Sequence, residues 1–482
     1  MMAEATQWLL TIVAGAALLA GCAVGPHYVR PTTTPPEMFR GHVGPQEAAS
    51  LADLPWWNVF QDPTLQQLLQ EALASNYDLR LAVARVEQAR AVAAVARGAF
   101  FPAIGYQSAI QRSHGGISSA LGLNPDTSIS THDLFVGLFS AIWELDIWGR
   151  IRRLNEAARA HFLATEEARR GVVLSLTSSV AQAYFELLEL DAKLDIAKQN
   201  TASFQSTYDL FRRRLTEGVA STLQTSRAEG ALGSAAATIP EFESQIAAKE
   251  NELSILLGRN PGSIPRGTPL FVQPVVPTIP PGLPSALLER RPDLRQAEQQ
   301  VVQANALVGV AEAAFFPQIN LTGFAGGVNP GLSGFSNVWS IAAGLTGPVF
   351  AGGRILENYR AHVAAWEQTK FQYAQAVITA FREVSSALTA LEKLVQVEAQ
   401  QTRAVQALED AVKTANTRYL GGLSSYYEVL EAQQQLFPVQ IKLAEVRANR
   451  LLTYVQLYKA LGGGWNLTDA QWSGSQAQSQ KQ

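Results

Sequence analysis

The 482-residue chain is poor in cysteine, in charge and in long apolar runs, and each shortage excludes a class of protein. Its single cysteine, Cys22, rules out an internal disulfide. Charged residues make up 16% of the chain, and the net charge of −3 gives no basis for nucleic-acid binding. No apolar run of about 18 residues or more follows residue 22, so we expect no membrane-spanning α-helix.

Groupings of residues that carry chemistry are missing as well. The six histidines have no spacing typical of a metal site, and no Ser/His/Asp or Cys/His grouping stands out. No glycine-rich loop follows a predicted strand in a way that could cradle a phosphate. We therefore expect no enzymatic activity and no metal or other cofactor.

The one cysteine follows a short apolar segment, residues 9–20, which has the length of a signal-peptide core and is too short to span a bilayer. The segment runs into Leu19-Ala20-Gly21-Cys22, which resembles the bacterial lipobox, where the cysteine thiol is lipidated and becomes the mature N-terminus. We predict lipidation at Cys22; the alternative is an ordinary signal peptide with a chance cysteine. Ala23 rather than Asp follows, which by resemblance to enterobacterial lipoproteins favours the outer membrane.

The strongest positive signal is an internal duplication. Segments 78–102 and 293–317 both open with Asp-Leu-Arg and close with Ala-Phe-Phe-Pro, and 14 of their 25 aligned positions are identical. A second offset, of 204 residues, relates Gly218-Val219-Ala220-Ser221 to Gly422-Leu423-Ser424-Ser425, and Gly258 to Gly462. Solenoid repeats have periods of roughly 20 to 50 residues, so these offsets indicate a duplicated half-molecule.

Both halves show the same order of predicted elements. The first has a helix over 63–97, strands over 102–114 and 131–144, and helices over 149–215 and 222–257. The second has a helix over 285–313, strands over 318–328 and 337–350, and helices over 354–420 and 424–461. We divide the chain into a signal peptide (1–21), an extended lipidated segment (22–62), a first repeat (63–260), a proline-rich linker (261–284), a second repeat (285–465) and a disordered tail (466–482).

The long helices and few strands indicate a protein that other copies complete. Four strands cannot close a barrel, which needs about eight, and open sheet edges are not tolerated inside a bilayer. We therefore predict a mainly α fold with a β-barrel part: a long coiled-coil α-barrel and four transmembrane β-strands per chain, internally duplicated. In the second half, apolar residues spaced alternately by 4 and 3 predict a coiled-coil seam at Val377, Phe381, Val384, Leu388, Leu391 and Val395. A less regular version of this spacing predicts the same seam in the first half, at Val180, Tyr184, Leu187 and Leu194.

Several motifs occur together over residues 19–465. They are Cys22-Ala23-Val24-Gly25-Pro26-His27-Tyr28, Trp56-Trp57 with Phe60-Gln61-Asp62-Pro63, Arg290-Arg291-Pro292-Asp293-Leu294-Arg295, and Ala460-Leu461-Gly462-Gly463-Gly464-Trp465. In combination they resemble the TolC family of outer membrane factors, specifically its lipidated OprM- and NodT-like subgroup. The resemblance implies completion as a homotrimer, with a barrel of twelve strands in the cell outer membrane and a tunnel of twelve helices across the periplasm.

The same resemblance implies a function. The chain would be the lipid-anchored exit duct of a tripartite efflux pump, passing small molecules and drugs passively from the periplasm to the outside. Its partners would be a periplasmic adaptor (membrane fusion protein), an inner-membrane RND-type pump and outer membrane lipid. Two alternatives stay open: a structural coiled-coil adaptor of the periplasm, and a type I secretion duct for a protein.

Two helical hairpins are the candidate docking tips for the adaptor. Their turns, at 217–221 and 421–425, contain glycine, which permits a tight turn, and small side chains, which allow close approach of another hairpin. The alternative is a plain turn between helices. The tip residues are Gly218, Val219, Ala220, Ser221, Gly422, Leu423, Ser424 and Ser425.

A candidate gate follows the second hairpin. Tyr427 and Glu431 are four residues apart and share a helix face; by resemblance they align with an inward Leu and Asp that ring the closed end. Three Glu431 carboxylates would form an acidic ring that favours cations. Gln434 stands where the family has an Arg that pairs with the acid, so Arg227, at the 204-residue offset from Glu431, is the candidate partner. The alternative is that Tyr427 and Glu431 only pack and solvate the hairpin.

Overall fold

The computed structural model describes residues 23–41, 50, 59–114, 131–274, 282, 284–330 and 334–463. The predicted signal peptide, Cys22, the loop 115–130 and the tail 466–482 lie outside these residues. The chain divides into two compact units, each built from both halves of the sequence. The first unit is Met1–Pro31, Val86–Thr165 and Ala297–Tyr373; the second is Thr32–Arg85, Glu166–Gln296 and Ala374–Gln482.

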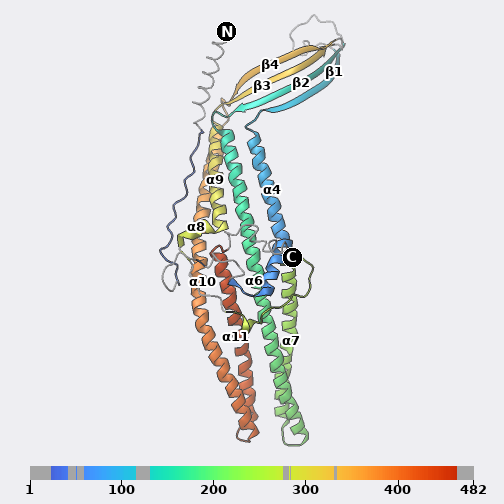
Figure 1. Ribbon diagram of the computed structural model, residues 1–482, viewed down its shortest axis with the longest axis vertical. Coiled ribbons are helices and arrows are strands. Elements are labelled where there is room, and N and C mark those ends of the chain that lie inside the picture. Colours follow the sequence, from blue (N-terminus) through green and yellow to red (C-terminus); the bar gives the residue numbers. More distant parts are fainter. Residues whose placement is uncertain are drawn as a thin grey trace, which may run out of the picture. The chain divides into compact units, whose positions relative to one another are not determined.

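The long helices occur in pairs of equal length, one from each half (Figure 1). Helices α4 (Tyr77–Gly98) and α9 (Pro292–Ala313) each have 22 residues. Helices α6 (Arg150–Thr216) and α10 (Arg354–Leu420) each have 67, and α7 (Thr222–Leu256) and α11 (Tyr426–Ala460) each have 35. The duplication read from short motifs therefore extends over whole helices.

One antiparallel sheet contains the four strands, in the order β1-β2-β3-β4. These are β1 (Ala103–His114), β2 (Thr131–Leu145), β3 (Gln318–Pro330) and β4 (Ser336–Thr346). The β2–β3 pair joins the two halves, with Phe139 opposite Ala325. Strand β4 ends before the predicted residue 350; Pro348 has no N–H to donate to a ladder.

The helix expected over 63–97 is broken, and so is its counterpart over 285–313. Helix α3 (Pro63–Ser75) is separated from α4 at Asn76, and α8 (Leu287–Arg290) from α9 at Arg291, 215 residues later. The Asn76 Nδ2 donates to the Leu256 carbonyl over 2.9 Å. The Arg291 Nη1 donates to the Ala460 carbonyl over 3.0 Å. At each break, a side chain thus donates a hydrogen bond to a backbone carbonyl at the end of α7 or α11, which has no partner within its own helix. Helical periodicity in the sequence does not reveal this hydrogen bond.

In the first unit, the extended segment 23–31 lies along helices α6 and α9. The Val24 N–H donates to the Trp148 carbonyl (3.0 Å), and the Arg153 guanidinium donates to the Val24 and Gly25 carbonyls (3.2 and 3.1 Å). Gly25, at φ +99°, passes Gly309 so closely that a Cβ on Gly25 would lie 2.5 Å from the Gly309 Cα. Glycine at position 25 therefore permits this crossing, both by its positive φ and by its lack of a Cβ.

Among the described residues, α6 is the helix long and apolar enough to cross a membrane by length and composition, with an 18-residue window of mean hydropathy 1.2. Two thirds of that window (67%) is buried inside the protein, as expected of a core helix. The predicted seam residues Val180, Tyr184 and Leu187 are fully buried, and so is Val384 on α10, whereas Val395 is half exposed. The seam prediction is therefore confirmed in its central part.

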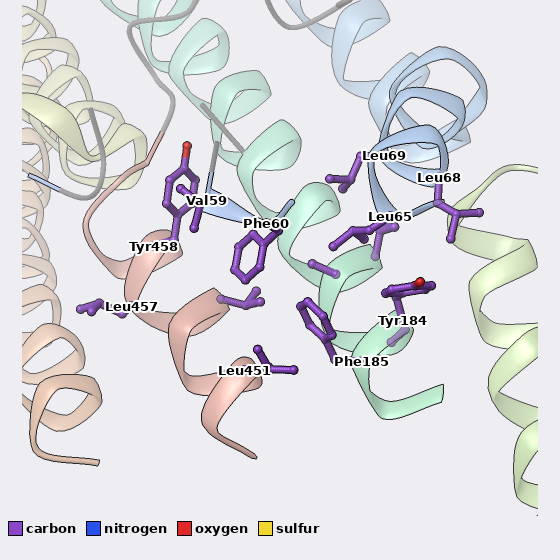
Figure 2. Close-up of a cluster of buried hydrophobic side chains, with 14 of the residues drawn as sticks. Val59, Phe60, Leu65, Leu68, Leu69, Tyr184, Phe185, Leu451, Leu457 and Tyr458 are labelled. Atoms are coloured by element: carbon purple, nitrogen blue, oxygen red, sulfur yellow. The ribbon is translucent and has the colours of Figure 1, made fainter. Parts of the chain in front are cut away.

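The core of the second unit forms where α3, α6 and α11 meet, around Val59, Phe60, Leu65, Phe185 and Leu451 (Figure 2). The rings of Phe60 and Phe185 lie 5.5 Å apart. A core built from α3, α6 and α11 therefore holds together elements of both halves.

A buried carboxylate, Asp62, borders this core and is only 1% exposed. Its Oδ1 accepts from the N–H groups of Thr64 and Leu65 and so caps α3. Its Oδ2 accepts from the Tyr184 hydroxyl (2.9 Å), the Thr268 N–H (3.1 Å) and the Gln273 Nε2 (2.8 Å). This one side chain therefore connects α3, α6 and the loop before α8.

Replacing Asp62 with Ala leaves several buried donors unpaired, so we expect Asp62→Ala to lower the free energy of unfolding by about 2 to 4 kcal/mol. Tyr184→Phe leaves the Asp62 acceptor in place and should cost about 1 kcal/mol. Denaturant unfolding of the purified protein, followed by tryptophan fluorescence, measures both. Asp78→Ala, at an exposed acid in the first turn of α4, is the control. Equal losses in Asp62→Ala and Asp78→Ala would contradict this role.

Candidate functional site

The first hairpin joins α6 to α7 through a turn centred on Gly218. Gly218 has a φ of +76°; its N–H donates to the Leu215 carbonyl (3.0 Å), and the Val219 N–H donates to the Arg214 carbonyl (2.9 Å). These two bonds make a Schellman cap, which needs a residue in the left-handed region. Ser221 then starts α7 with a capping box, in which its side chain and that of Gln224 bond to each other's backbone N–H.

The second hairpin joins α10 to α11 and repeats the cap. Gly422 has a φ of +72°; its N–H donates to the Tyr419 carbonyl (3.0 Å), and the Leu423 N–H donates to the Arg418 carbonyl (2.9 Å). Ser425 starts α11 without a side-chain cap bond, unlike its counterpart in the first hairpin. Figure 1 shows both turns at the same end of the second unit. The structure therefore brings together the tip residues predicted from the 204-residue offset.

Four glycines close the helices of the two hairpins, but their surroundings differ. A Cβ on Gly218 or Gly422 would meet nothing within 4 Å. A Cβ on Gly258, at the end of α7, would lie 2.4 Å from the Ser75 carbonyl oxygen. On Gly462, at the end of α11, it would lie 3.1 Å from the Arg290 carbonyl oxygen. The tip glycines thus face open space, whereas the other two are packed against backbone.

Large apolar side chains are exposed around both turns. Each is more than half exposed in the single chain: Val219, Leu223, Leu420, Leu423 and Tyr427. A cluster of such side chains at one end of a helical pair is typical of an interaction surface. The turns therefore have the character of a contact site.

An aromatic cluster holds the two hairpins together within one chain. The Phe211 and Tyr426 rings meet edge to face at 4.4 Å, and Tyr419 lies 5.2 Å from Tyr426. The Arg214 guanidinium stands over the Tyr419 ring at 5.1 Å and donates to its hydroxyl. Burial raises the pKa of Tyr426, with Tyr419 adding to the effect and a hydrogen bond from Thr207 opposing it.

Sequence reasoning missed this cluster, although one signal pointed to it. Extending the 204-residue offset backward pairs Arg214 with Arg418. The structure gives the two arginines different partners: Arg214 binds Tyr419 of the other hairpin, and Arg418 lies 3.9 Å from Glu428 of its own. The sequence shows that the arginine is duplicated, but the partners of Arg214 and Arg418 depend on how the two hairpins pack against each other.

Three of the four predicted gate residues, Tyr427, Glu431 and Gln434, lie on α11, and the fourth, Arg227, lies on α7. Tyr427 and Glu431 lie on the exposed face of α11, and the Glu431 Oε1 accepts from Gln435 Nε2 over 3.3 Å. Gln434 borders a cavity of about 270 Å³ beside Phe204, Phe437 and small residues of α7. Arg227 is exposed on α7 and makes no ion pair with Glu431 among the described residues. Within the described segments, no group of three His, Cys, Asp or Glu could hold a metal ion.

Comparison with known proteins decides the family. The family model described as outer membrane efflux protein matches residues 68–259 and 283–463. The chain belongs to the outer membrane efflux protein family. Its relatives in this family include the probable efflux pump outer membrane protein TtgC of Pseudomonas putida, 33% identical over 95% of this chain and 96% of TtgC. The cation efflux system protein CusC of Escherichia coli is 33% identical over 93% and 96%, and the probable outer membrane lipoprotein SilC of Salmonella typhimurium is 32% identical over 93% and 97%.

Solved structures of outer membrane channels have the same fold. The outer-membrane channel OprN matches with a TM-score of 0.84 and 27% identity, over 92% of this chain and 100% of OprN. CusC matches with a TM-score of 0.79 and 30% identity, over 92% and 100%. As a member of the outer membrane efflux protein family, the chain is the outer membrane channel of an efflux pump and not an enzyme. The predicted family, mainly helical fold with four strands, and outer membrane location are confirmed.

The two kinds of glycine predict different mutational costs. Gly258→Ala must displace the Ser75 backbone, so we expect it to lower the free energy of unfolding by about 3 kcal/mol or more. Gly218→Ala meets no atoms and should cost only the left-handed strain, about 1 to 2 kcal/mol. Denaturant midpoints of the two variants, each beside its counterpart at Gly462 or Gly422, give the comparison. A larger loss at Gly218 than at Gly258 would contradict the open tip.

Proposed function

We propose that this outer membrane efflux protein works as a homotrimer that encloses one continuous duct. The observation that carries the proposal is the four-stranded sheet, in which β1 and β4 each have a paired neighbour on one side only among the described strands. Unpaired edges are not tolerated in a bilayer, and three copies would supply twelve strands, above the minimum of about eight. Exposed apolar side chains on the outer strands suit contact with lipid: Ile104, Tyr106, Ile110, Ile341 and Leu345.

The two hairpin turns are the proposed docking tips for a periplasmic adaptor, which links the duct to an inner-membrane pump of the RND type. Exposed Val219 and Leu423, beside glycines that leave open space, favour close approach of a partner hairpin. Apart from Tyr427, which is assigned to the proposed gate, four apolar side chains around the turns are more than half exposed, and such a cluster favours an interaction surface over a plain turn.

The proposed gate is a ring of Tyr427 and Glu431 from three copies. Both side chains are exposed in the single chain, which leaves them free to face a common axis. Arg227 of a neighbouring copy is the proposed partner of Glu431, since within one chain Glu431 bonds to Gln435. An acidic ring favours passage of cations.

The proposed cargo is small molecules, passed without an energy source in this chain. Relatives are described as antibiotic, toluene and cation efflux proteins, which favours small solutes over a secreted protein. Lipidation of Cys22 is the proposed second anchor, supported by the description of SilC as a probable lipoprotein. Ala23, which follows the cysteine, packs against Gly149 where β2 gives way to α6.

Opening the gate should raise conductance. In planar bilayers we expect purified Tyr427→Ala/Glu431→Ala to conduct more at rest than the wild type, because both the bulk and the charge of the constriction are removed. Cells should also become sensitive to vancomycin-sized compounds. Glu241→Ala, an exposed acid of α7 far from the turn, is the control. No change in conductance between the double variant and the wild type would place the constriction elsewhere.

Bulky tips should block assembly with the pump. We expect Gly218→Phe and Gly422→Phe to fold and trimerise at the cost of left-handed backbone strain, because a Cβ there meets nothing within 4 Å in the single chain, yet to abolish drug efflux in cells that express the cognate pump. Asn tolerates the left-handed region and is small, so Gly218→Asn and Gly422→Asn should keep efflux. Drug tolerance and pull-down of the adaptor are the measurements. Unchanged tolerance in the Phe variants would argue against docking at the turns.

A further inference from the structure

A cavity of about 530 Å³ lies in the second unit, away from the hairpin turns. Helices α6, α10 and α11 and the loop that carries the 3-10 helix η2 (Leu270–Val272) line it. Its apolar lining includes side chains that are less than a tenth exposed: Leu188, Leu270, Val405 and Leu443. Phe271, 40% exposed, adds an aromatic ring. Neither the proposed gate nor the proposed docking tips involve this cavity.

Carboxylates dominate the polar part of the lining. Arg266 is the one cation among the lining residues, and Asp191 already pairs with it (2.9 Å), as does Glu250 behind it. Asp195 has no hydrogen bond or ion pair among the described residues. Glu409 accepts only from a neutral group, the Gln440 Nε2, at 3.3 Å.

The neighbouring cation, Arg447, also has interaction partners within the chain. Its guanidinium stands 5.0 Å from the centre of the Phe271 ring, and its Nε lies 3.0 Å from a Glu398 oxygen. Asp195 and Glu409 are both exposed and make no ion pair within 4 Å among the described residues, although Lys198 and Lys413 follow them by three and four residues on the same helices.

We propose that this cavity binds an organic cation with a flat apolar body, such as an aromatic quaternary ammonium compound. A volume of several hundred Å³ with apolar walls and a few polar groups is typical of a small-molecule site. The buried leucines and Val405 would take the apolar body out of water, and Asp195 and Glu409 would pair with its charge. An anionic amphiphile of the same size would be repelled. The site goes beyond the export function, because its occupation does not depend on conduction.

The test measures binding of ethidium to the full-length protein in lipid nanodiscs by fluorescence anisotropy. Wild type should bind it saturably, and Asp195→Asn/Glu409→Gln should raise the Kd about tenfold, as expected for the loss of two exposed charges. The control Asp209→Asn/Asp410→Asn removes two exposed acids of the same helices that do not line the cavity, and should bind like wild type. Ala192→Phe, which fills the cavity, should abolish saturable binding while size-exclusion chromatography shows an unchanged assembly.

Each opposite result overturns the proposal. Absence of saturable binding to wild type would mean that the cavity is closed, for example by a second copy of the chain. Equal Kd values for the Asp195/Glu409 variant and its control, or equally tight binding of anilinonaphthalene sulfonate, would remove the charge argument. The Tyr427→Ala/Glu431→Ala variant should keep the ethidium site; if it loses binding, the cation binds at the gate instead. Conductance and ethidium binding are thus separate readouts.

Discussion

A backbone amide inside a lipid bilayer must be hydrogen-bonded, since no water is available to replace a missing partner, and each unpaired group costs several kcal/mol. This constraint governs the architecture of the chain. Its four strands pair with one another but leave an edge on β1 and another on β4 among the described residues, and the proposed homotrimer would pair these edges. The β2–β3 ladder also explains why both halves are needed in one chain: it is the point at which strands of the two halves pair.

In both halves a side chain at the break between two helices donates a hydrogen bond to a helix-end carbonyl, but the residue type differs. Asn76 and Arg291 occupy equivalent breaks between helices, and both donate to a carbonyl at the end of the partner helix, one as an amide and the other as a guanidinium. Gly258 and Gly462 end those partner helices with the same left-handed cap. At the hairpins the paired arginines diverge further, because Arg214 reaches across to Tyr419 while Arg418 stays with Glu428 of its own hairpin. Backbone geometry is thus conserved between the halves more closely than side-chain partnership.

Much of the fold could be predicted from the sequence, because its signals are local. Helix lengths, the strands and both turns follow from periodicity, proline and glycine, and the 204-residue offset located the hairpins. Longer-range features were out of reach. The break at Asn76 interrupts an unbroken helical pattern, since its cause is a carbonyl 180 residues away. The carboxylate of Asp62 looked like part of a family motif, yet its donors come from three separate segments. The Arg214–Tyr419 contact likewise depends on how two hairpins pack.

The crossing of Gly25 over Gly309 makes the two halves no longer interchangeable. In the first half, the position equivalent to Gly309 is Ala94, at the 215-residue offset. A Cβ at position 309 would lie 2.9 Å from Cγ and Nε of Arg153, the side chain that holds the Val24 and Gly25 carbonyls. An alanine at 309, as at 94, would therefore force the Arg153 side chain to move from the position in which it binds those carbonyls. The two halves therefore differ at the helix position beside which the N-terminal segment passes, Gly309 in α9 against Ala94 in α4.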